Sequence, residues 1–472
     1  CLKPMKWTRK LTTKAGLKNS VAGFARDDSG SMTIFAVAMF MMMILVGGIG
    51  VDLMRNEMER TKMQATVDRA VQAAADLDQP LSPEDVVRDY FNKAGMSDYL
   101  SSVTVEGLNF RTVTASANMT TSTQFMHLMG VDGLPVPAQA QAEERVSNVE
   151  ISMVLDISGS MGWNNKMANL QTAAKTFVDT VIREENDDLI SVSLIPYTAQ
   201  VNAGYDIFSQ METVHRHNYS YCIDFEIADF SEAGLDLDTA YEQMQHFDEG
   251  WNYSNPVSNP GCPKRSYEEI VPFSQNATTL KNTIDDYRAR ANTSIHLGMK
   301  WGVALLDPSF RPSNQELSMP GTDIVDDALA NRPAPYSDVE TLKTVVLMTD
   351  GQNVDTTRIQ PWYYNSPSEY AHWNRYPLHW YLNNYVYGSW SNWRYTKYTS
   401  AQADSMLANI CTAAKDKGIV VWSVGFEVTD YSAGVMESCA SSPSHFFRVE
   451  GVEITEAFEA IAKQINQLRL TQ

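Results

Sequence analysis

Three oxygen-bearing side chains alternate in the segment Asp-Ile-Ser-Gly-Ser, namely Asp156, Ser158 and Ser160. A fourth, Thr293, stands at the predicted start of a helix, and a fifth, Asp350, is followed by a glycine. Oxygen ligands suit a hard divalent cation, which takes six of them in a near-octahedral array if it is Mg²⁺. We therefore predict a cation site at these five residues, with Mg²⁺ as the first candidate and Mn²⁺ or Ca²⁺ as alternatives.

The predicted site carries little negative charge for a cation site. Its three hydroxyls are neutral, and in such an array the two carboxylates can act largely through bound waters. The cation would then be under-neutralised and would keep an open position for an incoming carboxylate, as working sites do. The alternative is an idle site whose hydroxyls only cap helices.

Buried strands must position these side chains. Four apolar runs have the composition of strands buried on both faces: Ile151–Leu155, Leu189–Ile195, Thr344–Met348 and Ile419–Val424. Apolar residues at helical spacing occupy 170–182, between the first two runs, and 454–468. Strands that alternate with helices predict an α/β fold with a doubly wound, mainly parallel sheet. Asp156 and Asp350 would then meet at the carboxyl edge of the sheet, where such folds bind ligands.

We predict four parts along the chain. They are a basic segment at 1–30, a transmembrane helix at 31–53, a membrane-proximal helix with a small α+β domain at 54–148, and the main α/β domain at 149–472. Two large insertions, at about 198–290 and 355–400, interrupt the main domain. They exceed ordinary loop lengths, so we expect them to be folded and functional.

The anchor is predicted from one apolar stretch, Met32–Val51, which holds no charge and is long enough to cross a bilayer core. Residues 1–30 hold seven basic and two acidic residues, a local charge of +5. The positive-inside rule therefore places the N-terminus in the cytoplasm and everything after Asp52 outside.

The net charge and the cysteines indicate which partners and which compartment suit the part of the chain after residue 30. The chain has a net charge of −20, so the part after residue 30 carries −25, which argues against a nucleic-acid partner. Four of the five cysteines form two close pairs, Cys222 with Cys262 and Cys411 with Cys439. This spacing predicts two disulfides in an oxidising compartment, with four buried thiols as the alternative.

The five oxygen-bearing residues, taken in order, resemble the metal-ion-dependent adhesion site (MIDAS) of von Willebrand factor A domains. The rest of the chain resembles TadG-type proteins of the bacterial tight-adherence (Flp) pilus apparatus. The segments that carry this second resemblance are 28–36, 50–52, 62–70, 294–302, 306–308, Cys411, 439–440 and 468–470. The two insertions lie outside it.

The resemblance implies an envelope-anchored component of pilus assembly or adhesion. It places the protein in the bacterial inner membrane as a single-pass protein, with its bulk periplasmic or directed to the surface. TadE-like relatives and prepilins are cut after a glycine that is followed, five residues on, by a glutamate. Phe35 stands at that position after Gly30, so we expect a retained anchor.

The second insertion suggests how a partner could be bound. It holds fourteen Trp and Tyr residues between Trp362 and Tyr398. Exposed aromatic residues are favoured at interfaces, and the candidates for partner contact are Trp362, Tyr363, Tyr364, Trp373, Trp380, Trp390 and Trp393. The alternative is that they pack the insertion's own core.

Three function classes follow from these observations. We favour a binding protein that engages a protein partner, such as another pilus or envelope component, through the cation; a carbohydrate ligand has no support. The alternative is a scaffold component in which the metal only stabilises the fold. We do not expect an enzyme, because the sequence holds no G-x-S-x-G, H-E-x-x-H or phosphate-binding glycine loop.

Overall fold

The computed structural model describes residues 31–76, 81–106, 110–145, 148–183, 189–236, 239–250, 255–322, 324–338 and 340–471. The chain divides into two compact units, Cys1–Arg145 and Val146–Gln472. This division falls close to the predicted start of the main domain at residue 149. The predicted basic segment and Gly30 lie outside the described residues.

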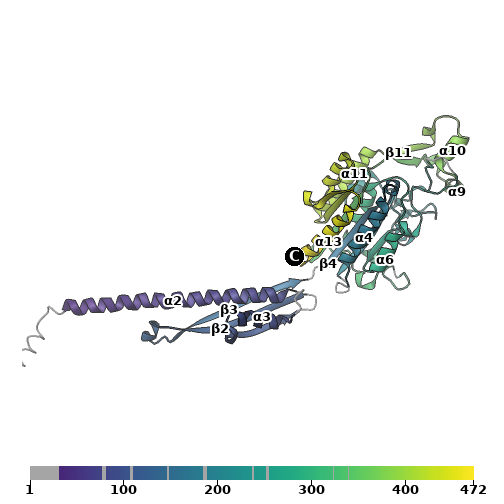
Figure 1. Ribbon diagram of the computed structural model, residues 1–472. Coiled ribbons are helices and arrows are strands. Elements are labelled where there is room, and N and C mark those ends of the chain that lie inside the picture. Colours follow the sequence, from purple (N-terminus) through teal and green to yellow (C-terminus); the bar gives the residue numbers. More distant parts are fainter. Residues whose placement is uncertain are drawn as a thin grey trace, which may run out of the picture. The chain divides into compact units, whose positions relative to one another are not determined.

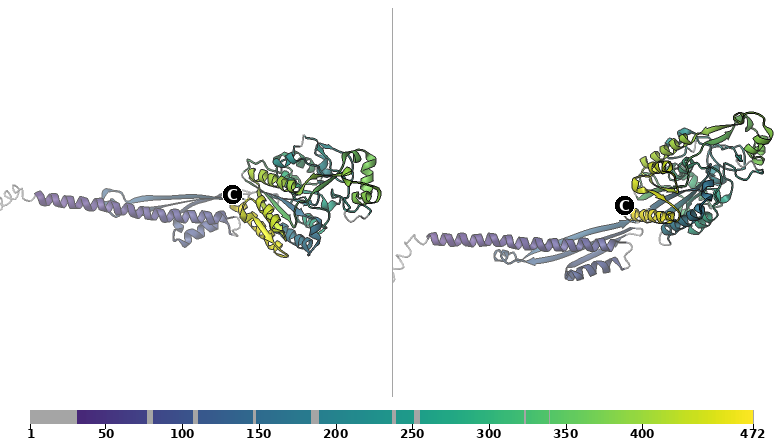
Figure 2. Two further views of the ribbon diagram at one scale, coloured as in Figure 1. Left: turned by 90° about the horizontal axis from the view of Figure 1, so that it is seen from above. Right: turned by 45° about the horizontal axis from the view of Figure 1, so that its top comes forward.

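The first unit is built on one long helix, α2 (Ser31–Ala75), which runs without interruption (Figure 2). The predicted transmembrane helix and the membrane-proximal helix expected after it form one continuous helix, which contains no proline. Its N-terminal part is apolar and exposed, and it is the one candidate membrane span among the described residues. Its C-terminal part buries Met63, Val67, Ala70 and Ala74, which lie on one face at helical spacing.

A three-stranded antiparallel sheet packs against this C-terminal part of α2. Its strands are β1 (Leu100–Glu106), β2 (Phe110–Ser122) and β3 (Gly133–Arg145), in that order. Helix α3 (Pro83–Lys93) follows α2, and Ser82 Oγ caps its start by accepting from the backbone N–H of Asp85. The short 3₁₀ turns of this unit are η2 (Ser97–Tyr99) and η3 (Met126–Met129). Apolar side chains of α2, α3, β2 and β3 share one core.

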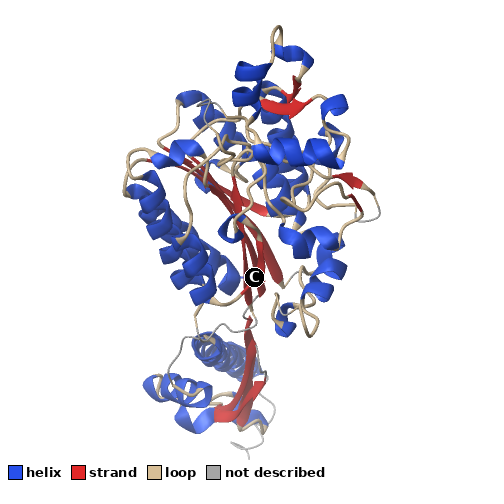
Figure 3. Ribbon diagram, turned by 90° about the vertical axis from the view of Figure 1, so that its right-hand side faces the viewer, coloured by secondary structure: helices blue, strands red, loops and turns tan. Residues whose placement is uncertain are grey.

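The second unit is an α/β domain around a six-stranded mixed sheet (Figure 3). The strand order is β13 (Phe446–Val449), β12 (Val420–Phe426), β9 (Thr341–Thr349), β4 (Asn148–Asp156), β5 (Ile190–Tyr197) and β8 (Val271–Ser274). The first five are parallel to one another, and β8 is antiparallel to β5 at one edge. All four predicted buried strands are present, and the α/β prediction is confirmed at this level.

Helices cover both faces of this sheet. One face carries α4 (Lys166–Val181), α6 (Ala277–Asp285) and α13 (Glu453–Thr471), and α4 and α13 lie side by side (Figure 1). The other face carries α7 (Ile295–Ala304), α11 (Ser400–Asp416) and α12 (Asp430–Cys439). Alternate strand residues therefore belong to separate cores: Ile151 and Met153 pack under α4, whereas Val154 packs under α7.

The segment 198–290 contributes both to the sheet layer and to structure outside it. Strand β8 and helix α6 belong to the sheet layer, so less of this segment lies outside the α/β framework than its polar composition suggested. The remaining elements are α5 (Gly204–Ser209), β6 (Thr213–Val214), η6 (Ile227–Ser231), β7 (Tyr241–Glu242) and η7 (Ser266–Glu268). Further along the chain are η8 (Pro308–Phe310), α8 (Arg311–Leu317), η9 (Asp327–Leu329) and η12 (Pro443–His445).

The segment 355–400 folds into its own small structure. It contains a two-stranded antiparallel sheet, β10 (Thr356–Ile359) with β11 (Arg394–Tyr398), and two short helices, α9 (Pro367–Arg375) and α10 (Leu378–Tyr385). The turns η10 (Pro361–Tyr363) and η11 (Trp390–Asn392) complete it. Its buried residues share a core with Cys222, Met244, Phe247 and Cys262, so the two segments pack as one body.

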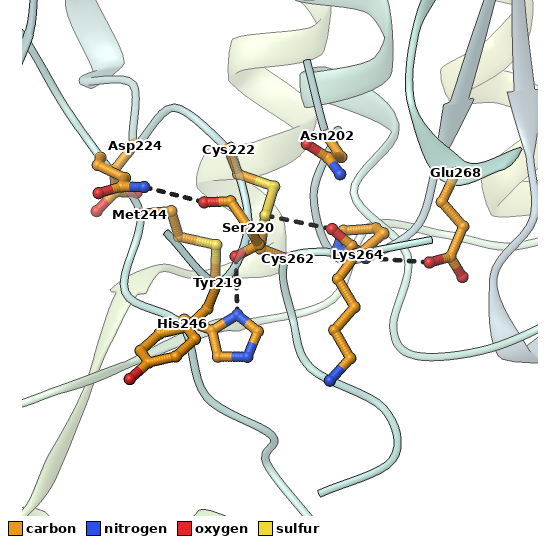
Figure 4. The surroundings of a disulfide bond; sticks show 12 residues. Asn202, Tyr219, Ser220, Cys222, Asp224, Met244, His246, Cys262, Lys264 and Glu268 are labelled. Carbon is orange, nitrogen blue, oxygen red and sulfur yellow. Dashed lines mark hydrogen bonds between the residues drawn. A yellow bond between two sulfur atoms is a disulfide. The ribbon is translucent and has the colours of Figure 1, made fainter. Parts of the chain in front are cut away.

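Both predicted disulfides are present. Cys222–Cys262 closes a loop of the first segment and lies beside a buried hydrogen bond between Ser220 Oγ and His246 Nδ1 of 2.8 Å (Figure 4). Cys411–Cys439 joins α11 to the end of α12. Both bonds lie within the second unit, which is consistent with an oxidising compartment.

Removal of either disulfide tests how far these bonds stabilise the second unit. The bonded cysteines are 40 and 28 residues apart, and chain-entropy arguments give about 3–4 kcal/mol for loops of this size. We expect the Cys411→Ser, Cys439→Ser double variant to lower the free energy of unfolding by about that amount in denaturant titrations. Alkylation of all four cysteines of the native protein without reductant would contradict the assignment.

Candidate functional site

The carboxyl ends of β4 and β9 bring two aspartates to the same edge of the sheet. The two strands are adjacent and parallel. Asp156 is the last residue of β4, and Asp350 directly follows Thr349, the last residue of β9. Asp156 is fully buried and Asp350 is 6% exposed. Two carboxylates are thus held close together with little access to water.

A continuous run of hydrogen bonds joins the predicted ligands. Thr293 Oγ1 donates to Ser158 Oγ at 2.8 Å, and the hydroxyls of Ser158 and Ser160 lie 3.0 Å apart. Ser160 Oγ donates to Asp350 Oδ1 at 2.6 Å. Asp156 Oδ1 accepts from the backbone N–H of Ser158 at 2.8 Å. The structure therefore brings all five predicted residues together, from segments far apart in the chain.

Two glycines allow the loops at this edge to approach one another. The backbone N–H of Gly159 donates to the carbonyl of Ala291 at 3.0 Å, and a Cβ on Gly159 would lie 2.9 Å from that oxygen. Such a contact would push the loop of Ser158 away from that of Thr293. A Cβ on Gly351 would lie 3.6 Å from the hydroxyl of Thr293, so this position also faces the cluster.

The protein compensates the charge of Asp156 only in part. Its Oδ2 accepts from Thr349 Oγ1 at 2.7 Å and from the Tyr197 hydroxyl at 3.4 Å. Burial, followed by the negative charge of Asp350, raises the pKa of Asp156 to about 6. No cationic side chain is hydrogen-bonded to Asp156 among the described residues. This electrostatic deficit favours a bound cation.

Lys166, the first residue of α4, was not identified from the sequence. Its Nζ lies 3.0 Å from Asp350 Oδ2 and 3.6 Å from Glu427 Oε2, and the residue is only 8% exposed. Lys166 therefore neutralises the charge of Asp350, one of the two aspartates. A basic residue a few positions after the Ser160 turn was the only sequence signal for it, whereas Glu427 had none.

A cavity of about 380 Å³ opens beside the hydroxyl cluster. Gly159, Ala291 and Asn292 line it from the loops that hold Ser158 and Thr293. Residues 247–250 and 355–358, from the two segments outside the sheet layer, line it as well. Asn292 Nδ2 donates to Glu249 Oε2 at 2.9 Å, which links the first segment to the loop of Thr293. The loops that carry Ser158 and Thr293 and these two segments thus border one space.

The structure divides the seven aromatic candidates for partner contact. Tyr364 and Trp373 are buried in the core that the two segments share, so they are not available to a partner. Tyr363 and Trp393 stack on each other with ring centroids 3.9 Å apart. Trp362 is 58% exposed, and the remaining candidates, Trp380 and Trp390, are partly exposed. Core packing therefore accounts for some of this cluster, because a small folded segment needs large side chains to bury.

The described residues offer no cluster of three His, Cys, Asp or Glu side chains that could hold a metal. The two histidines near the start of the first segment are engaged: His215 Nε2 and His217 Nε2 hydrogen-bond to the carbonyls of His217 and Met244, respectively. Two carboxylates with three hydroxyls remain as the candidate ligand set. That set suits Mg²⁺ or Mn²⁺ better than Zn²⁺.

Replacement of Lys166 tests the electrostatic balance of the cluster. Lys166→Met keeps the length of the side chain but leaves two buried carboxylates without a cation. We expect the free energy of unfolding, measured with EDTA present, to fall by about 3 kcal/mol. The control is Lys415→Met in α11, whose Nζ contacts the carbonyl of Ser438 near the surface. An equal loss in both variants would contradict the account.

Comparison with protein-family models gives a match over residues 30–77 to Tad, described as a putative Flp pilus-assembly TadE/G-like family. This segment contains the whole of α2. A search of curated proteins gave no match.

Several solved structures are similar to the chain at low identity. The vWF domain of the type V pili tip protein Mfa5 from Porphyromonas gingivalis is 14% identical, with a TM-score of 0.35, and the match covers 68% of this chain and 96% of that one. The adhesive tip pilin GBS104 from Group B Streptococcus agalactiae is 11% identical, with a TM-score of 0.32 and coverage of 67% and 100%. The pilus adhesin SpaC from Lactobacillus rhamnosus GG is 12% identical, with a TM-score of 0.31 and coverage of 78% and 34%, about a third of that adhesin's length.

These structural similarities are too distant to support a conclusion about fold or function. The fold and the candidate site are therefore described from the geometry of this chain alone. The family match is specific to the N-terminal helix, where the sequence resembled TadG-type proteins. Residues 30–77, which we call the Tad segment, are therefore similar to the putative Flp pilus-assembly TadE/G-like family.

Proposed function

We propose that the protein is a membrane-anchored, extracytoplasmic component of a pilus apparatus that binds a protein partner through a divalent cation. In this proposal the second unit is a von Willebrand factor A-type domain with a doubly wound sheet and two insertions. Its cation site is the MIDAS formed by Asp156, Ser158, Ser160, Thr293 and Asp350. The observation that carries the proposal is the hydrogen-bonded run through all five residues at the carboxyl edge of the sheet.

The chemistry of these residues supports a hard cation. The hydroxyls of Ser158, Ser160 and Thr293 would be direct ligands, while Asp156 and Asp350 would supply the negative charge. A bound cation would stabilise the ionised form of Asp156, whose burial now disfavours it. Its open position would accept a carboxylate from the partner.

The surroundings of the cluster support recognition of a protein rather than a bare ion. The cavity beside it is bordered by both segments outside the sheet layer, so the same contact could read the partner's neighbouring side chains. Trp362 offers an exposed aromatic anchor on the second segment. The Tad segment supports other pilus or envelope components as partners, and the exposed apolar part of α2 supports an inner-membrane anchor.

The pH dependence of cation binding follows from the raised pKa of Asp156. The cation requires the ionised carboxylate, and below pH 6 a proton competes for it. Without metal, protonation of Asp156 stabilises the fold, and this contribution is lost as pH rises through about 6. The increase in Tm produced by Mg²⁺ should therefore be larger at pH 7.5 than at pH 5. Equal increases at both pH values would contradict this assignment.

The stabilisation by Mg²⁺ should depend on the predicted ligands. At a concentration 100 times its Kd, Mg²⁺ should add about 2.7 kcal/mol to the free energy of unfolding of the native protein. We expect Asp156→Ala and Thr293→Ala to abolish this addition. Asp416→Ala, on the exposed surface of α11, should retain it and serves as the matched control.

Partner binding is tested in intact cells with Asp156→Ala. We expect normal protein levels but a loss of piliation or adhesion, because the partner's carboxylate has no cation to bind. If piliation and adhesion survive at normal protein levels, the metal has only a stabilising role, and the scaffold alternative holds. Asp416→Ala again provides the control for the substitution itself.

A further inference from the structure

The tip of the β2–β3 hairpin contacts the apolar, membrane-spanning part of α2 as well as the part of the helix that follows it. The tip comprises the residues between Ser122 and Gly133 and includes the 3₁₀ turn η3. A Cβ on Gly48 would lie 2.3 Å from the ring of Phe125, so that ring packs directly on the helix backbone. Gly48 belongs to the charge-free stretch 32–51. The hairpin therefore contacts the last uncharged turn of the span, residues 48–51.

One carboxylate fastens the tip at this depth. Asp52, the first charged residue after the stretch, is 3% exposed. Its two oxygens accept from three consecutive backbone N–H groups, those of Gln124, Phe125 and Met126, at 2.8–3.2 Å. Hydrogen bonds to a charged acceptor are among the stronger ones in proteins. The tip is thus held in one place along the helix.

Two large apolar side chains of the tip are exposed, and none of the described residues covers them. Leu128 is 75% exposed and Met129 is 53% exposed. Ile44 and Val51, which lie on the same side of α2 as Gly48 by helical spacing, are 48% and 49% exposed. The tip thus continues the apolar surface of the span on the side that follows Gly48 toward Asp52.

The depth of the tip matches a membrane interface. Gly48 lies four residues before Asp52, or ~6 Å along the helix axis. Apolar faces of interfacial segments are buried about 5–10 Å into the boundary between headgroups and acyl chains. The hydrogen-bonded polar pair at the tip, His127 with Asp132, is exposed and can remain among the headgroups.

We propose that the hairpin tip is a second membrane contact, which inserts Phe125, Leu128 and Met129 into the outer leaflet beside α2. The bilayer is the occupant of this surface because the surface is continuous with that of the span. This proposal rests on the membrane anchor of the proposed function and goes beyond it. Together, the span and the tip would fix the orientation of the first unit relative to the bilayer. A single helix would not fix it.

The test places an environment-sensitive fluorophore at three positions of the full-length protein. Leu128→Cys, Phe40→Cys and Val105→Cys are each made with Cys1→Ser, labelled with NBD, and reconstituted into phosphatidylcholine and phosphatidylglycerol vesicles. Phe40 lies in the middle of the span, and Val105 lies on the exposed surface of β1. Quenching by lipids with a doxyl group on the acyl chain reports contact with the bilayer.

We expect doxyl lipids to lower the emission at position 128 by about half, as for a group in the interface, and to leave position 105 unchanged. Quenching at 40 without quenching at 128 overturns the inference while the anchor stands. Lack of quenching at both positions overturns the anchor as well. A blue-shifted emission at 128 without quenching would mean that protein covers the tip, which also overturns the inference.

A second variant tests the role of Asp52 in holding the tip. Asp52→Asn retains the shape of the side chain but removes its charge and one acceptor oxygen. We expect weaker quenching at position 128 and unchanged quenching at position 40. Full quenching at 128 in this variant would contradict the fastening of the tip by Asp52.

Discussion

Two carboxylates buried at the ends of adjacent parallel strands are the constraint on which the rest of the second unit depends. Asp156 and Asp350 must lie close together because β4 and β9 are hydrogen-bonded neighbours. Burial of like charges is unfavourable unless cations or hydrogen-bond donors compensate them. The chain supplies Lys166 for Asp350, but for Asp156 it supplies only hydroxyl and amide donors. A divalent cation among the three hydroxyls is the compensation that the geometry favours.

The loops that carry these residues approach one another closely and border a cavity. The loops of Ser158 and Thr293 approach closely because Gly159 leaves room for the carbonyl of Ala291. The same loops border a cavity that residues of the two outer segments complete. In the proposed function, a partner bound at the cation would lie near these segments, and their side chains could then contribute to the choice of partner. Recognition and cation binding would then depend on one another.

The sequence was sufficient for the elements with strong periodicity and for the candidate ligands. Continuous apolar runs identify β4, β5, β9 and β12, and the turns after β4 and β9, with Thr293 before α7, indicate the five residues that the structure brings together; that they bind a cation stays a prediction. It could not identify Glu427, which contacts Lys166 from a loop far along the chain. Nor could it show that Trp373 is buried, because an aromatic residue at an interface and one in a small core look alike in sequence.

The central claim is that one divalent cation binds among the hydroxyls of Ser158, Ser160 and Thr293. An anomalous difference map from a crystal of the protein soaked in Mn²⁺ tests it most directly. The account predicts a single strong peak within bonding distance of those three oxygens. A map with no peak there, or with its strongest peak elsewhere in the second unit, would contradict it.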